Sequence, residues 1–293
     1  MAEHYEAKHH HSEREDTSLD ASAEDKQDAA DNHSLSPVSV YIVVHEEGME
    51  ELRRPAKSLW WSGVAAGIAI SASVLAEGIL HTIFLDHPYR VAIENLGYTV
   101  GFVLVILGRL QLFTENTITA ILPLLSRPSR EMAWCTARLW AIVFLANMAG
   151  TLGAAMMTLW VRTVPPDYAE GMMAISAHYG ELSAWDAFVR GTPAGFFVAA
   201  IVWMLPSARA SAIFVIMMFT YLIAMGDFTH VIAGSTELFL LLLDGQLGMG
   251  HALALLFVTL AGNIVGGTGL FAVLAYGQVA DELDDEAQAA DQP

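Results

Sequence analysis

Three ionisable side chains interrupt an apolar stretch in the second half of the chain. The stretch, "AIFVIMMFTYLIAMGDFTHVIAGSTELFLLLL", carries Asp227, His230 and Glu237, and it is long enough to cross a lipid bilayer by itself. A continuous lipid-facing helix does not tolerate such groups, whereas a helix broken at "GDFTH" does so if the break lines a cavity. Histidine exchanges protons near neutral pH, since its ordinary pKa is about 6.5. We therefore predict that His230 binds a substrate and relays or polarises a proton; a histidine satisfied by core packing is the alternative.

A second interrupted stretch lies in the first half of the chain. It reads "YTVGFVLVILGRLQLFTENTITAILPLLS" and contains an arginine, a glutamate, an asparagine and several threonines. Paired interruptions in matching halves are the best sequence indication of a transport site. We expect Thr114 to form a hydrogen bond with His230. Arg109 and Glu237 are expected to form structural ion pairs with each other or with Glu77, or to bond freed backbone carbonyls.

The elements that position these residues must be membrane helices. The chain has 293 residues, of which 54% are hydrophobic and 16% are charged, against about 25% charged in a typical soluble domain. Most of the net charge of −18 lies in two acidic tails, which argue against nucleic acid and anionic membrane surfaces as partners. We predict a disordered acidic tail at 1–45, an interfacial amphipathic helix at 46–58, a transmembrane pore domain at 59–278 and an acidic tail at 279–293.

Hydropathy predicts six membrane segments. Basic residues gather before the first segment and in the loops after the second and the fourth, while the opposite loops are more acidic. The positive-inside rule then places both termini in the cytoplasm. We expect a multi-pass protein of a bacterial-type cytoplasmic (inner) membrane. The expected segments are 59–84, 97–125, 134–160, 187–205, 211–243 and 249–277.

The two halves of the pore domain share three signals in the same order. Gly-x-x-x-Gly occurs in the first and fourth segments, "QLF" (111–113) and "ELF" (237–239) in the second and fifth, and "NMAGTLG" (147–153) and "NIVGGTG" (263–269) in the third and sixth. Three crossings is an odd number, so the second half must be inverted relative to the first. We predict inverted repeats at 59–160 and 187–277. The glycines should let neighbouring backbones come close, and the two Asn-Gly stretches should support the two broken helices.

At "GRLQLFTEN" (108–116), "DFTHVIAG" (227–234) and "GNIVGG" (262–267) the chain resembles the formate–nitrite transporter family, over residues 50–278. The resemblance implies an all-α, aquaporin-like subunit with six crossings and broken second and fifth helices. It further implies a pentamer with one pore per subunit. The implied substrates are small monovalent anions such as formate, nitrite or hydrosulfide, and their passage is often coupled to protons.

The resemblance also assigns pore residues. Leu112, Phe113 and Thr114 match the family's loop after the first half-helix, His230 matches its central pore histidine, and Asn263 matches its sixth-segment motif. Because aromatic side chains around a break can close a pore by excluding water, Phe113 and Phe228 are candidate hydrophobic gates.

The chain also departs from the family pattern. The departures from the usual pore residues are Glu115, Thr229, Gly195 and Gly234. The family's vestibule lysine is absent, and His178 stands near its position, with Tyr179 an equal alternative by spacing. Cationic His178 or Arg190 is expected to gather anions at the outer mouth. An ionised Glu115 would repel anions, so it must point away from the pore, cap the next half-helix or be protonated.

We therefore predict a membrane channel or transporter for small monovalent weak-acid anions, proton-linked through His230. No enzymatic activity, cofactor or metal is expected. The expected partners are the anions, protons, the lipid bilayer and copies of the chain. One alternative is an aquaporin-like channel for neutral solutes, which would not need the histidine; the other is a non-transporting sensor or scaffold of the same fold. An intramembrane enzyme is disfavoured because the chain lacks His-Glu-x-x-His and Gly-x-Ser-x-Gly motifs.

Overall fold

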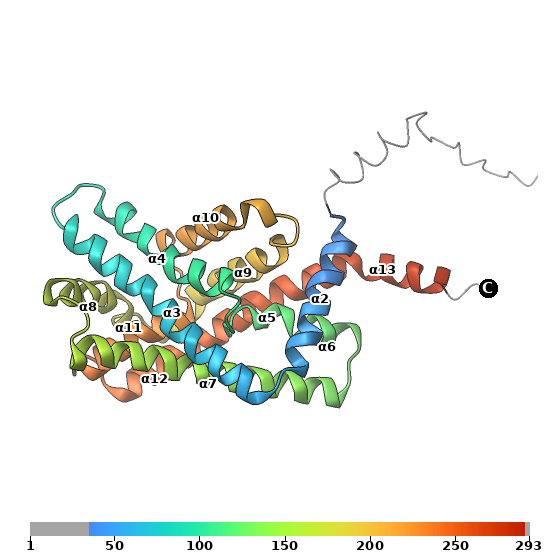
Figure 1. Cartoon of the computed structure of the whole chain (residues 1–293), viewed down its shortest axis with the longest axis horizontal. Helices are drawn as coiled ribbons and strands as arrows, with labels where there is room; N and C mark the ends of the chain where they lie inside the picture. Colours follow the sequence, from blue (N-terminus) through green and yellow to red (C-terminus); the bar gives the residue numbers. More distant parts are fainter. Residues whose placement is uncertain (1–34, 291–293) are drawn as a thin grey trace, which may run out of the picture. The chain divides into compact units, whose positions relative to one another are not determined.

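The computed structural model describes residues 35–290, and nearly all of that range is helical (Figure 1). Most of the acidic tail predicted at 1–45 lies outside the described residues. The helices are α2 (Pro37–Arg53), α3 (Ala56–Ile83), α4 (Arg90–Leu107), α5 (Asn116–Thr119), α6 (Leu122–Ser126), α7 (Arg130–Met156), η1 (Met157–Val161), α8 (Pro166–Gly180), α9 (Ala184–Met204), η2 (Arg209–Ser211), α10 (Ala212–Met225), α11 (Val231–Leu243), α12 (Met249–Ile264), η3 (Val265–Ala272) and α13 (Val273–Ala290).

Serine caps explain where three of these helices begin. The Ser36 hydroxyl accepts a hydrogen bond from the Ser39 N–H at 3.1 Å, and Pro37 follows as the first helical residue of α2. Ser129 and Ser183 accept equivalent bonds at the starts of α7 and α9, at 3.0 Å and 3.1 Å. These caps satisfy backbone N–H groups that the first turn of a helix leaves without a partner.

Within residues 35–290, five helices are long and apolar enough to cross a membrane, namely Ala56–Ile83, Arg90–Leu107, Arg130–Val161, Ala184–Met204 and Met249–Leu283. The fifth predicted segment, 211–243, is divided into the shorter helices α10 and α11. The second predicted segment is divided into α4 and the short helices α5 and α6. The predicted interruptions of the second and fifth segments are therefore confirmed.

Two helices differ from the sequence-based expectation. The helix expected at 46–58 occupies Pro37–Arg53, and its apolar side chains pack against residues of α5, α6 and α13. The loop expected between the third and fourth segments contains α8, which packs against α3 and α11. Whether α2 also contacts the membrane surface stays a prediction.

Glycines let the helices of each half cross closely. A methyl group added to Gly150 of α7 would lie 2.8 Å from the Cα of Gly67 on α3, and one added to Gly266 of η3 would lie 2.8 Å from the backbone nitrogen of Phe196 on α9. The second glycine of each Asn-x-x-Gly-x-x-Gly stretch, Gly153 or Gly269, has open space at the same place. The prediction of a glycine contact face holds for the first glycine of each stretch and is wrong for the second, because only the first lies on the helix face turned toward its neighbour.

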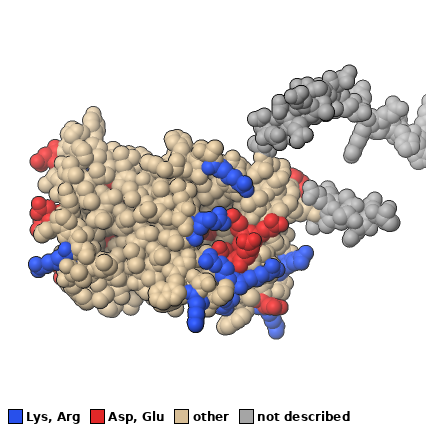
Figure 2. Space-filling model, in the orientation of Figure 1, with Lys and Arg blue, Asp and Glu red and all other residues tan. Residues whose placement is uncertain are grey.

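Charge is distributed unevenly between the two ends of the helices. Lys and Arg side chains gather beside α2, where Arg54, Arg109 and Arg209 line one cavity, and acidic side chains lie among them (Figure 2). Arg138 of α7 donates to the backbone oxygens of Leu52 and Arg54, which fastens the end of α2 to α7. Arg54, Arg138 and Arg209 come from the three basic regions that predict cytoplasmic termini, and they therefore lie at one end of the molecule.

Candidate functional site

The two half-helices that lead into the breaks end in the same way. α4 ends before Gly108, and α10 ends before Gly226. The next residues, Arg109 and Asp227, have φ values of 50° and 54°, in the left-handed region that L-residues rarely adopt. A left-handed residue after the last turn is a common way to stop a helix and turn the chain. The backbone therefore leaves both half-helices in equivalent directions.

Asn147 of α7 and Asn263 of α12 hold the two breaks through matching hydrogen bonds. The Asn147 side chain accepts from the Phe113 N–H at 2.9 Å and donates to the carbonyl oxygens of Gly63 and Gln111, each at 2.8 Å. The Asn263 side chain accepts from the Val231 N–H at 2.8 Å and donates to the carbonyl oxygens of Gly191 and Thr229, each at 2.9 Å. Both side chains are fully buried.

These contacts define how the two halves correspond. Gln111–Phe113 matches Thr229–Val231, because two hydrogen bonds of each asparagine end on the first carbonyl and the last N–H of these tripeptides. The prediction that "QLF" corresponds to "ELF" at Glu237–Phe239 is therefore wrong. Glu237 lies within α11, beyond the break, so the resemblance of the two tripeptides has no structural counterpart. His230 occupies the position that Leu112 holds in the first half.

His230 and Thr114 meet where the two breaks come together. Thr114 Oγ1 lies 2.7 Å from His230 Nε2, and both side chains are almost fully buried. The Ala233 N–H donates to His230 Nδ1 at 3.2 Å, so His230 is also the N-cap of α11. A nitrogen that accepts carries no proton, so the neutral imidazole has its proton on Nε2, facing Thr114. The ring of Phe102 lies edge-on to the imidazole, with centroids 4.9 Å apart.

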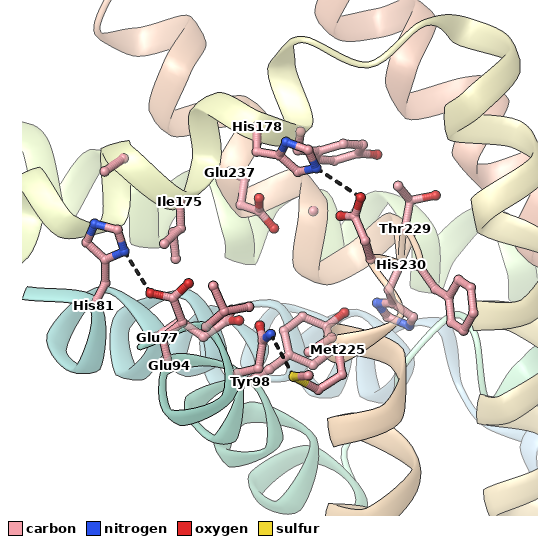
Figure 3. A pocket seen from close by; sticks show the side chains of 18 of the residues that line it. Glu77, His81, Glu94, Tyr98, Ile175, His178, Met225, Thr229, His230 and Glu237 are labelled. Atoms are coloured by element: carbon pink, nitrogen blue, oxygen red, sulfur yellow. Dashed lines mark hydrogen bonds and ion pairs between the residues drawn. The ribbon is translucent and has the colours of Figure 1, made fainter. Parts of the chain in front are cut away.

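Two cavities approach this contact from opposite ends of α4. The α8 cavity, about 470 Å³, is lined by the N-terminal part of α4, by α8 and by the second break, and it includes His230, Phe228 and Thr229 (Figure 3). The α2 cavity, about 630 Å³, is lined by the C-terminal end of α4, by α2 and by residues of the first break. Leu112, Phe113 and Thr114 are buried and line neither cavity. The two cavities are therefore not joined through the His230–Thr114 contact, which we call the constriction.

Charged side chains in the α8 cavity form two paired groups. Asp227 contacts both His178, at 2.9 Å, and Arg190. Glu94 contacts His81 at 2.8 Å and Arg90 at 3.4 Å. Asp227 thus offsets the positive charge of Arg190 and occupies a ring nitrogen of His178, the two residues expected to gather anions.

Arg109 and Glu115 both line the α2 cavity. Arg109 Nη2 lies 3.3 Å from Glu47 Oε1 on α2, and the Arg109 side chain is 79% exposed. The prediction that Arg109 pairs with Glu237 or Glu77 is wrong, because those carboxyl groups line the opposite cavity. Glu115 stands at the start of α5 without a side-chain capping bond, and its Oε1 is buried without a hydrogen-bond partner among the described residues.

The remaining predicted residues fall into different environments. Phe113 points toward α7, where its ring packs against Trp140 and Phe144. Phe228 lines the α8 cavity and packs against Phe197 of α9. Thr229 lines the same cavity and donates to the carbonyl oxygen of Ala187 at 2.8 Å. Asn263 was expected at the pore, but its amide group is used in supporting the second break.

Two residues of the site were not singled out individually by sequence reasoning. Sequence reasoning identified Asn147 only as the first residue of the Asn-x-x-Gly-x-x-Gly motif, the position that Asn263 has in the second copy. Phe102 was hidden in an apolar run, and no sequence signal distinguishes it from its neighbours. Its role next to His230 follows from the rotation of α4 about its own axis.

The fold and the site together define a class of protein: a multi-pass membrane protein of the aquaporin-like fold, built from an inverted repeat whose two broken helices meet between two cavities. The sequence profile described as "Formate/nitrite transporter" matches residues 38–277. The chain belongs to the formate/nitrite transporter family, whose members are transporters and channels.

Individual relatives agree with this assignment. The chain is 36% identical over 253 residues to inner membrane protein YfdC of Escherichia coli (strain K12), covering 86% of this chain and 82% of that protein. It is 30% identical to formate-nitrite transporter 3 of Toxoplasma gondii, covering 78% of this chain and 49% of that protein.

Solved structures share the fold. A pentameric formate channel with formate bound has a TM-score of 0.67 at 23% identity and covers 77% of this chain and 97% of its own. An FNT family ion channel has a TM-score of 0.71 at 17% identity and covers 82% of this chain and 99% of its own.

Proposed function

We propose that the protein is a channel or transporter for small monovalent weak-acid anions such as formate or nitrite, and that their passage is linked to protons. Membership of the formate/nitrite transporter family supports this, as does the fold shared with a formate channel. The observation that carries the proposal is the hydrogen bond between His230 and Thr114 at the constriction between two cavities.

The hydrogen-bond directions suggest what the constriction does to an anion. His230 Nδ1 accepts from a backbone N–H, so Nε2–H donates to Thr114 Oγ1. The Thr114 hydroxyl is then free to donate its own hydrogen to an oxygen of a passing anion. Donation from the histidine strengthens donation by the threonine, because hydrogen bonds in a chain polarise one another. Thr114 and His230 therefore bind and polarise the anion as a unit.

An anion loses most of its hydration in such a narrow place, which costs several kcal/mol even after relaxation of the protein. The Thr114–His230 pair offsets part of this cost, and addition of a proton to the anion removes most of the rest. Formate and nitrite accept a proton readily because their acids are weak, whereas chloride does not. We therefore expect weak-acid anions to cross much faster than chloride, and faster at lower pH.

Anion uptake into proteoliposomes tests the proposal. Formate, nitrite, acetate and chloride would be compared across pH for the native protein and for His230→Ala. We expect formate and nitrite uptake well above that of empty liposomes, and a loss of about tenfold or more in His230→Ala, since one strong hydrogen bond is worth about 1.4 kcal/mol or more. His87→Ala serves as the control, because His87 lies in an exposed turn. Uptake equal to that of empty liposomes for every anion would overturn the proposal.

We also propose a pentamer with one pore per subunit, located in a cytoplasmic membrane with both termini on the cytoplasmic side. A similar structure is described as pentameric, a relative is described as an inner membrane protein, and the basic residues lie at one end. Large apolar side chains such as Trp61, Trp134 and Phe214 are more than half exposed, as lipid or a neighbouring subunit requires. Native mass spectrometry would give the subunit number, and protease access to a C-terminal tag in inverted vesicles would give the orientation.

A further inference from the structure

The α8 cavity holds two carboxyl groups that none of its cations neutralises. Glu77 of α3 and Glu237 of α11 line this cavity, and neither has a hydrogen-bond or ion-pair partner among residues 35–290. Figure 3 shows both side chains pointing into the cavity, above the Tyr98 ring and to one side of His230. Glu77 is only 8% exposed. A side chain so deeply buried and aimed into a cavity indicates that something occupies its oxygens.

The other charged groups around the cavity are already paired. Asp227 is held by His178 and Arg190, and Glu94 is held by His81 and Arg90. The remaining titratable groups that face the two carboxyl groups are neutral hydroxyls and an imidazole: Tyr98 from α4, Tyr179 from α8 and His230 from the second break. The Tyr179 hydroxyl is bonded to Thr259 at 2.7 Å. No cation therefore remains for Glu77 and Glu237 in the described part of the cavity.

Two ionised carboxylates that line one cavity repel each other, and the burial of Glu77 makes its ionised form costly. Protonation is the one way to neutralise them that needs no further protein group. Active sites that use a carboxylic acid as a proton donor also keep a carboxyl group protonated in this way. The backbone supports this placement, since Gly97 of α4 lies against the Glu77 backbone and fixes α3 there.

We propose that Glu77 and Glu237 form a proton-holding site that protonates the weak-acid anion in the α8 cavity before it reaches the constriction. This inference rests on the proposed function. In the step, the proton leaves a carboxyl oxygen of the pair and joins an oxygen of the anion, which gives the neutral acid and a carboxylate. Water entering from the open side of the cavity returns a proton to the pair. The acid then crosses between Thr114 and His230 without a net charge.

This arrangement explains why His230 is not the donor. The neutral imidazole has its only ring proton on Nε2, so giving that proton away would leave an imidazolate. A carboxyl group gives up a proton at far lower cost. It also explains how an anion can be accepted by a cavity without a lysine, because a proton supplied by Glu77 and Glu237 replaces the charge that a fixed cation would supply.

Infrared spectroscopy tests the proton directly and does not depend on transport. The spectrum of the double variant Glu77→Gln/Glu237→Gln at neutral pH would be subtracted from that of the native protein. We expect a carbonyl stretching band of a protonated carboxylic acid in the difference, shifted in heavy water. Glu94→Gln serves as the matched control, because Glu94 lines the same cavity but is paired with the Arg90 guanidinium and the His81 imidazole, and its difference spectrum should lack the band. Absence of the band from the double-variant difference would overturn the proposal.

A second measurement uses only the native chain, so it does not depend on the variants folding. The oxygen of a protonated carboxyl group adds to the central carbon of a hydrophobic carbodiimide while its proton passes to a carbodiimide nitrogen, and peptide mass spectrometry identifies the residue that is modified. We expect modification at Glu77 or Glu237 and none at Glu94. Modification of Glu94 with both other residues untouched would contradict the proposal.

Transport measurements separate this inference from the proposed function. We expect the double variant to take up formate at least tenfold more slowly than the native protein near neutral pH and to lose most of its acceleration at low pH. Native uptake rates in a folded double variant, with His230→Ala inactive, would refute the proton-holding site and leave the proposed function intact. Failure of the native protein to transport any anion would refute the proposed function, and the infrared band would still decide whether the site holds a proton.

Discussion

Asn147 and Asn263, one in each half of the chain, make matching sets of three hydrogen bonds that join the two backbone breaks to neighbouring helices. Each side chain accepts one N–H of its break and donates to one carbonyl oxygen of the break and to one of a continuous helix, Gly63 of α3 or Gly191 of α9. Since the irregular backbone of a membrane protein must be satisfied by other protein groups, these amides make the breaks possible.

Replacing either asparagine by alanine should destabilise the protein to a similar extent. Each change leaves one N–H and one carbonyl group of a buried break without their partner, at a cost of about 1–3 kcal/mol for each such group. Thermal unfolding of Asn147→Ala and Asn263→Ala in detergent would measure this. Asn95→Ala is the control, since among the described residues the Asn95 side chain forms a hydrogen bond only with the Met225 sulfur. A native melting temperature for either variant would contradict the supporting role.

The hydroxyl of Thr114, rather than its shape, should matter for transport. Thr114→Val keeps the volume but leaves His230 Nε2–H without an acceptor, so we expect formate uptake to fall about tenfold or more. Thr114→Ser keeps the hydroxyl and should retain most of the rate. Thr163→Val, at an exposed threonine that bonds the Met157 carbonyl, should change nothing. Equal rates for the Val and Ser variants would show that the hydroxyl has no role.

Arg109→Gly should stabilise the protein by up to about 1 kcal/mol. The φ of Arg109 is 50°, a conformation that costs an L-residue about 1–2 kcal/mol and glycine almost nothing. Its ion pair with Glu47 is exposed and contributes little. Chemical unfolding would compare this variant with Arg127→Gly, where φ is −137° and no such strain exists. A larger loss of stability at Arg109 than at Arg127 would contradict the argument.

The two glycines of the first Asn-Gly stretch should respond oppositely to alanine. At Gly150 a methyl group meets the backbone of α3, with the Cα of Gly67 at 2.8 Å, so Gly150→Ala should prevent close packing and lower the yield of folded protein. At Gly153 nothing lies within 4 Å, so Gly153→Ala should be neutral or stabilising by about 0.5–1 kcal/mol. Size-exclusion profiles and melting temperatures would decide, and similar behaviour of the two variants would count against this helix contact.

The attachment of α2 should weaken at acid pH through His45. Burial, assisted by the nearby Arg127 guanidinium, lowers the pKa of His45 below its usual value near 6.5. A lowered pKa means that the unfolded chain takes up the proton first, so the contribution of His45 to stability is complete above pH 6.5 and is lost as the pH falls below it. The protection of α2 amides against hydrogen exchange, measured relative to their intrinsic exchange rate at the same pH, should therefore fall between pH 7.5 and 5.5. His45→Gln should make this protection less sensitive to pH, because glutamine does not titrate; an unchanged pH response would exclude His45 as the cause.

Much of the architecture was predictable from sequence. Charges inside apolar runs locate the two breaks, because a lipid-facing helix cannot carry them, and the odd number of crossings per half requires the inversion. The family motifs singled out His230 and Thr114. The breaks, the inversion and the motif residues depend only on residue types and on their order along the chain, and both can be read directly from the sequence.

Partners across the fold were decided only by the tertiary structure. Arg109 pairs with Glu47 rather than Glu237, and Thr229–Val231, not "ELF", corresponds to Gln111–Phe113. That Glu77 and Glu237 face one cavity and pair with none of its cations follows from the rotation of α3 and α11 about their axes and from where these helices cross. Rotation and crossing are fixed by close packing at glycines distant in sequence, so no local pattern of residues reveals which side chains will meet.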